Sequence, residues 1–196
     1  MRNSLNLIVV LMFLFGFTSC KNTESDDKVS SDSEIESTEN ASFNEDKEKA
    51  EIKEVITKET ESFFNRDYDQ WAKYWIKKEY SFRAGNGPDS TYAMYGWKSI
   101  SYHIKNYDQE TYKDKKGGKY KSTKRENFII RFNSENSAYA KWEQYNRLTT
   151  QDIYYKSEES RLLEKEDDEW KIVNVLAFWD RSKPVDSLTV QQGLKD

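Results

Sequence analysis

Apolar positions near the start of the folded region recur at the spacing of an α-helix. Between residues 44 and 65 they recur at intervals of three, four or seven positions from one another, so they would share one face of a helix. They are Ile52, Val55, Ile56 and Phe63. Ser42 stands three residues before Glu45, which is the spacing of a capping box and indicates where this helix begins.

Two further helices are predicted from shorter patterns. Asp67 can cap a second helix, which would carry the apolar residues Trp71, Tyr74, Trp75 and Ile76. Residues 79–84 then alternate like a short strand, and the turn residues at 85–88 end it. A third helix follows Gly96, with one face formed by Trp97, Ile100, His103 and Ile104.

From Lys119 onward the apolar period changes to about two, which is the period of β-strands. Strands are expected around residues 128–132, 138–147, 154–165 and 170–180, with short turns between them. One face of the second strand would hold Ala138, Ala140, Trp142, Gln144 and Asn146. Consecutive strands with short connections form an antiparallel meander. About three helices followed by such a sheet predict an α+β fold in which the helices pack on one sheet face.

The last of these strands, residues 170–180, is the most apolar run in the folded region. Strict alternation predicts that one face holds Trp170, Ile172, Leu176 and Phe178, and that the other holds Val173, Val175, Ala177 and Trp179. Because both faces are apolar, both should be covered, so the strand should lie inside the sheet and not at its edge.

The N-terminus has the features of an export signal. Arg2 precedes an apolar run of about a dozen residues, which is too short to span a membrane. The run ends in Ser19-Cys20, and Cys20 is the only cysteine in the chain. This ending resembles a bacterial lipoprotein signal, which implies lipidation of Cys20 and a membrane-anchored protein of the cell envelope, on the periplasmic side or at the cell surface. Ordinary cleavage nearby, leaving Cys20 as a free thiol, is the alternative.

Composition divides the remaining chain. Residues 20–41 are polar and acidic and carry two isolated aliphatic residues, which predicts a disordered tether. The expected organisation is therefore a signal peptide (1–19), a tether (20–41), a domain (42–182) and a C-terminal tail (183–196). Residues 1–40 hold three basic and seven acidic side chains, which leaves 28 of each sign in residues 41–196. A neutral domain behind an acidic tail disfavours nucleic acid as a partner.

Several segments together resemble the nuclear transport factor 2-like superfamily, which includes SnoaL-like and ketosteroid-isomerase-like proteins. They are the two helices joined by residues 65–68, the helix beginning Gly96-Trp97, and the hairpin from Arg161-Leu162-Leu163 to Trp170-Lys171-Ile172-Val173. The resemblance covers roughly residues 45–181. It implies helices in the concave face of a curved, mainly antiparallel sheet, forming a cone with an apolar pocket.

No motif for a metal, a nucleotide or a covalent nucleophile occurs, and one His and one Cys are too few for a His/Cys zinc site. No cofactor is expected. His103 and Asp180 are the catalytic candidates, because imidazole and carboxylate groups transfer protons. Each also has a purely structural explanation: His103 as a half-buried side chain bonded to backbone, and Asp180 as a partner of Arg181 or a strand cap.

The residues expected to line a ligand pocket are polar and aromatic: Trp75, Tyr95, Trp97, His103, Trp142, Gln144 and Trp179. Aromatic walls suit a small apolar or aromatic ligand, although Trp97, Trp142 and Trp179 could equally be core. The favoured hypothesis is ligand binding without turnover. The alternatives are an isomerase, dehydratase or hydrolase using His103 and Asp180, a glycosidase using Glu143 with Glu158 or Glu159, and a homodimer formed through an exposed sheet face near Tyr139, Tyr145 and Tyr154.

Overall fold

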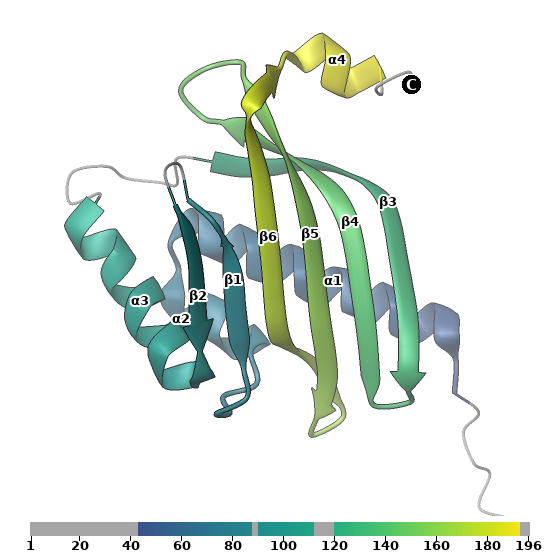
Figure 1. Cartoon of the computed structure of the whole chain (residues 1–196). Helices are drawn as coiled ribbons and strands as arrows, with labels where there is room; N and C mark the ends of the chain where they lie inside the picture. The colour runs from purple at the N-terminus through teal and green to yellow at the C-terminus, as the bar shows by residue number, and fades with distance from the viewer. Residues whose placement is uncertain (1–42, 88–89, 112–119, 193–196) are drawn as a thin grey trace, which may run out of the picture. The chain divides into compact units, whose positions relative to one another are not determined.

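A computed structural model describes residues 43–87, 90–111 and 120–192 (Figure 1). Residues 41–196 form one compact unit, and the signal and tether predicted for residues 1–41 lie outside the described residues. Within these ranges no helix is both long enough and apolar enough to cross a membrane.

The long N-terminal helix packs on one face of the sheet. The long helix α1 (Glu45–Asn65) begins at Asn44, whose side chain accepts a hydrogen bond from the Lys47 amide at 3.1 Å. The predicted capping residue Ser42 lies outside the described residues. Figure 1 shows α1 crossing behind the strands, and its buried face includes Ile52 and Ile56, as the apolar spacing predicts.

The second helix is shorter than its apolar pattern suggests. Asp67 caps α2 (Tyr68–Trp71) by accepting from the Gln70 amide at 3.0 Å, and a 3₁₀ turn, η1 (Ala72–Tyr74), continues it. The chain then leaves the helix because Trp75 forms a bridge with Ile172 of the sheet. The third predicted helix is α3 (Gly96–Thr111).

The sheet has six strands in the order β2-β1-β6-β5-β4-β3, and all neighbours are antiparallel except β1 and β6. The predicted meander and the α+β architecture are confirmed. The strands are β1 (Phe82–Asn86), β2 (Thr91–Tyr95), β3 (Tyr120–Ser134), β4 (Ser137–Leu148), β5 (Tyr154–Glu166) and β6 (Glu169–Val185).

Strand β6 lies inside the sheet as predicted, but its predicted faces are wrong. Leu162 pairs with Asn174 while Leu163 pairs with Ile172, so Val173 is an extra residue on β6. Such a β-bulge shifts the alternation by one position. Trp170 and Ile172 therefore share the inner core with Val175 and Ala177, with Trp179 packed against it; the outer face is not fully covered, since Phe178 is 47% exposed.

The C-terminal tail predicted from residue 183 is in part an extension of the domain. Strand β6 continues to Val185, and helix α4 (Ser187–Gln192) follows. Val190 of α4 is buried in a small cluster with Tyr145 and Tyr154. These two tyrosines are therefore covered and do not form the exposed sheet face proposed for a dimer.

Candidate functional site

A cavity of about 370 Å³ opens between the helix layer and the inner face of the sheet. Residues of α1, α2, β1, β2 and β6 supply most of its lining, and α3, β3, β4 and β5 contribute the rest. All six strands thus contribute to its lining, and α1 forms a wall.

Strand register brings the charged floor of the cavity together. Arg83 of β1 pairs with Val175 of β6, which pairs in turn with Arg161 of β5. Ala177 and Glu159 are also paired, two residues further along these strands on the same face. Since strands are about 4.8 Å apart, the Cα atoms of Arg83 and Arg161 are separated by roughly two strand spacings.

A buried ion cluster occupies part of this floor. The Glu59 side chain is fully enclosed and accepts a hydrogen bond from the Trp71 indole N–H at 2.7 Å. Arg161 lies 3.6 Å from Glu59 and 3.0 Å from Glu159. Both carboxylates therefore have a counter-charge, which a buried charge requires if it is to be tolerated.

A chain of hydrogen bonds continues along the inner face of β4. The Gln144 carbonyl oxygen accepts from Arg125 Nε at 2.8 Å, and its amide donates to Asn146 at 2.7 Å. Asn146 donates in turn to the Ser157 hydroxyl at 2.9 Å. Burial and the nearby Arg161 guanidinium lower the pKa of Arg125 from its ordinary value. This network fixes the side chain of Gln144, the member that lines the cavity.

The rest of the lining is mainly apolar and aromatic. Phe64 and Tyr120 both make edge contacts with Trp179, with ring centroids 6.3 and 4.9 Å apart. Other members of this wall come from the helices and from β2: Phe63, Tyr68, Trp71, Tyr92, Met94 and Ile104. The cavity combines aromatic walls with a charged floor, an arrangement typical of small-molecule sites.

Similar architecture occurs in several solved structures. A cystatin-like fold protein of unknown function from Nostoc punctiforme matches with a TM-score of 0.53 and 14% identity over 68% of this chain and 92% of its own. An NTF-2 like protein of unknown function from Shewanella oneidensis matches with a TM-score of 0.51 and 20% identity, over 67% and 98%. The domain has the nuclear transport factor 2-like fold.

Another neighbour of this nuclear transport factor 2-like domain is a hexachlorocyclohexane dehydrochlorinase, LinA-type3, from Novosphingobium barchaimii. It matches with a TM-score of 0.53 and 15% identity, over 73% of this chain and 93% of its own. No protein-family model and no curated protein matches the sequence. Identities this low establish the fold alone.

The predicted pocket residues are only partly brought together in the nuclear transport factor 2-like domain. Gln144 and Trp179 line the cavity, whereas Trp75 and Trp142 are buried in the core beside it. Trp97 packs against that core and stacks on Trp71, with ring centroids 5.7 Å apart. Tyr95 is 73% exposed on β2, because strand alternation turns it away from the inward-facing Met94.

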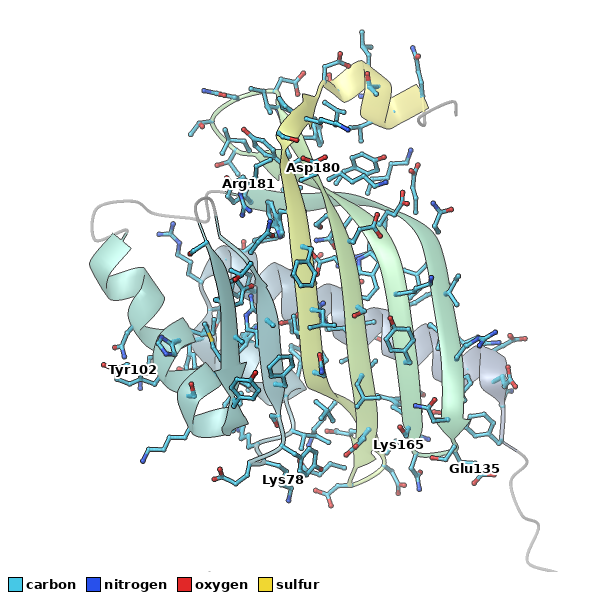
Figure 2. All side chains as sticks on the ribbon, in the orientation of Figure 1. Lys78, Tyr102, Glu135, Lys165, Asp180 and Arg181 are labelled. Carbon is cyan, nitrogen blue, oxygen red and sulfur yellow. The ribbon has the colours of Figure 1, made fainter. Side chains whose placement is uncertain are left out.

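The structure does not place His103 and Asp180 around one cavity. His103 is exposed on α3, where its ring lies against Tyr102, a residue that Figure 2 shows on the outer side of that helix. Asp180 is exposed near the upper end of β6 in Figure 2 and accepts hydrogen bonds from the Ser182 hydroxyl and amide. The Ser182 hydroxyl and amide lower the pKa of Asp180, which makes it a weaker base.

Of the carboxylates considered for glycoside hydrolysis, Glu159 is separated from the other two by the sheet. Glu143 and Glu158 are cross-strand partners, and the Lys156 ammonium lies within 2.9 Å of one and 3.6 Å of the other. Glu159 points to the opposite face and into the cavity. This pairing of Glu143 with Glu159 is therefore excluded by alternation along β5.

Several charged cavity residues, Glu59, Arg161 and Arg83 among them, were absent from the residues predicted to line the pocket, although the sequence carries signals for two of these three. Glu59 falls three positions after Ile56 on the apolar face of α1, and Arg161 falls two before the buried Leu163 on β5. Arg83 lies in a strand too short to assign a face by alternation. Cys20 lies outside the described residues, and within them no group of three His, Cys, Asp or Glu residues could hold a metal ion.

Proposed function

We propose that this chain is a lipid-anchored envelope protein whose nuclear transport factor 2-like domain binds a small apolar or aromatic molecule without turning it over. The observation that carries the proposal is the aromatic-walled cavity of about 370 Å³. This volume falls within the roughly 300–1,000 Å³ of ordinary ligand pockets. The walls supply apolar contact area, and the polar floor supplies groups that can orient a ligand.

The absence of turnover is supported by the state of the acidic groups in the cavity. Glu59 and Glu159 are both engaged by Arg161, so neither offers an unengaged carboxylate for proton abstraction. The alternative of an isomerase, dehydratase or hydrolase using His103 and Asp180 needs both groups at one cavity. Neither is among the cavity-lining residues, which weighs against that alternative.

Lipid anchoring rests on the sequence, through the single Cys20 at the end of the apolar run. A homodimer through the outer sheet face is a further alternative. Tyr139 and Phe178 are exposed there at 39% and 47%. Charged residues lie beside Phe178 on this face, since its cross-strand partner Glu158 forms an ion-paired patch with Lys156 and Glu143. Sedimentation of the purified chain would test this alternative, and a monomer would contradict it.

Ligand binding can be tested with N-phenyl-1-naphthylamine, a neutral aromatic probe that fluoresces strongly in apolar surroundings. The full chain carrying Cys20→Ser should enhance its fluorescence. Ala177→Phe should weaken binding by at least about tenfold, because Ala177 lines the cavity and a phenyl ring there would occupy it.

The matched control is Phe178→Ser, one residue along the same strand. Phe178 is exposed on the outer face, so this variant should bind the probe as the parent chain does. Circular dichroism melting would establish that both variants fold. No enhancement with the parent chain, or enhancement lost only in Phe178→Ser, would contradict a ligand site in the cavity.

A further inference from the structure

The cavity carries an excess of positive charge inside a domain with no net charge. Its lining holds the guanidinium groups of Arg66, Arg83, Arg161 and Arg181 and the carboxylates of Glu59 and Glu159. Among the described lining residues, four positive charges against two negative ones leave a net charge of two positive. The sequence of residues 41–196 has equal numbers of acidic and basic side chains, so this excess is local.

Arg83 is the most distinctive member of this set. Only 6% of the residue is exposed, and its Nε has no hydrogen-bond partner among the described residues. Its guanidinium carbon lies 4.5 Å from the centroid of the Phe63 ring. No carboxylate of the described part of the chain lies within ion-pair distance of Arg83. A guanidinium keeps its charge at any ordinary pH, so a buried and unpaired one has a strong preference for an anion.

The other cavity arginines have different environments. Arg161 is paired with both cavity carboxylates. Arg181 donates to the backbone carbonyls of Asn86 and Gly87 at 3.2 Å, and Figure 2 shows it near the upper end of β6. Arg83 on the floor therefore holds an uncompensated charge in the cavity, and Arg181 adds a positive charge at another part of the lining.

We propose that the cavity selects an amphiphilic monoanion, a small molecule with an aromatic or branched apolar body and one carboxylate, and that Arg83 binds the carboxylate. This inference deepens the proposed function and rests on it. A guanidinium can bind a carboxylate with two parallel hydrogen bonds. The apolar residues around Arg83 suit the body of such a ligand: Phe63 packs on its guanidinium and Met94 is its cross-strand partner.

The test compares 2-naphthoate with 2-naphthamide, which has nearly the same shape and no charge. Isothermal titration calorimetry of the full chain with Cys20→Ser should give at least about tenfold tighter binding of the carboxylate, the effect of one charge-assisted contact. Arg83→Gln should remove this preference by weakening 2-naphthoate at least about tenfold, while 2-naphthamide changes by less than about twofold.

Arg131→Gln is the matched control, because Arg131 is exposed on β3 and is not among the residues that line the cavity. It removes the same charge and should leave both affinities unchanged. Arg83→Lys, which keeps the charge and loses the planar fork, should fall between the parent chain and Arg83→Gln. If Arg83→Gln does not fold, the comparison of acid and amide on the parent chain still tests whether the cavity selects an anion, and Arg83→Lys tests the part of Arg83.

The failure of this inference is distinguishable from the failure of the proposed function. Equal affinity of the parent chain for acid and amide would overturn anion selection, as would a carboxylate preference that survives in Arg83→Gln. Binding of N-phenyl-1-naphthylamine without binding of 2-naphthoate would also overturn it and leave the ligand-binding function intact. Absence of binding by all three probes would overturn both.

Discussion

In the first turn of α1 the buried carboxylate of Glu48 has the partners that Arg83 lacks. It accepts a hydrogen bond from the Trp170 indole N–H at 2.6 Å and lies 2.8 Å from the Lys165 ammonium. Burial by itself would raise the pKa of Glu48, but the bonds to Lys165 and Trp170 outweigh it and hold the pKa below its ordinary 4.5. The stabilisation is therefore present above that value and is lost as the pH falls through the lower folded-state pKa.

Glu48→Gln should lower the free energy of unfolding near neutral pH by about 1–3 kcal/mol, the cost of leaving buried donors without their charged acceptor. The difference from the parent chain should shrink as the pH falls through the folded-state pKa of Glu48, which lies below 4.5, because Glu48 is then protonated as well. Urea unfolding near neutral pH and below the folded-state pKa of Glu48 measures the two free energies of unfolding.

The control for Glu48 is Glu45→Gln in the same turn. Glu45 pairs with Lys49 at 2.7 Å on the surface, and its side chain is 61% exposed, so its loss should cost less than about 1 kcal/mol. A difference for Glu48→Gln that is the same at both pH values would argue against an ionic contribution.

At the scale of elements, the short strand β1 joins its hairpin to the rest of the sheet through parallel pairing with β6. Gly85 of β1 pairs with Ala177 of β6. A Cβ atom at this position would lie 2.1 Å from the Ala177 carbonyl oxygen and 2.8 Å from the Tyr92 hydroxyl. Backbone would therefore have to move to admit any side chain at Gly85.

Gly85→Ala should destabilise the domain by about 1–3 kcal/mol or more, as overpacking does, and thermal melting measures the change. Gly87→Ala is the matched control, because the nearest atom to a Cβ there is 3.5 Å away; its melting temperature should stay close to that of the parent chain. Equal melting temperatures for both variants would show that β1 can shift without cost.

Most helices and strands could be predicted from the apolar periodicity, because a long amphipathic segment shows clearly whether its period is that of a helix or of a strand. α1 and the inward face of β4 were predictable in this way. The bulge at Val173 was not, since both faces of β6 are apolar and either register buries the same kinds of residue. Helix α4 was not predictable either, because it is short and its one buried residue, Val190, packs against tyrosines of β4 and β5 that are distant in the sequence.

The candidate site was predictable to a smaller extent. Gln144 and Trp179 could be placed from their strands, but a cavity forms from the register of several elements at once. Arg83 and Arg161 line the same cavity because β6 pairs with β1 on one side and with β5 on the other. Aromatic residues did not identify the cavity reliably, because a tryptophan such as Trp75 or Trp142 can pack in the core as readily as it can line a ligand site.

At the scale of the whole molecule, the proposal places a ligand-binding domain at a membrane through Cys20. Cys20→Ser should move the protein from the membrane fraction to the non-membrane fraction of expressing bacteria, because a serine lacks the thiol to which the lipid would be attached. Ser19→Ala retains a small residue before Cys20 and should leave the distribution unchanged. Membrane association of Cys20→Ser equal to that of the parent chain would contradict lipid anchoring.

The most direct test of the central claim is a crystal structure of the chain grown with 2-naphthoate. The predicted result is a naphthalene ring between Phe63, Phe64 and Trp179, with the carboxylate on the guanidinium of Arg83. A cavity filled by the protein's own side chains, or a ligand found only on the outer sheet face near Phe178, would contradict the claim.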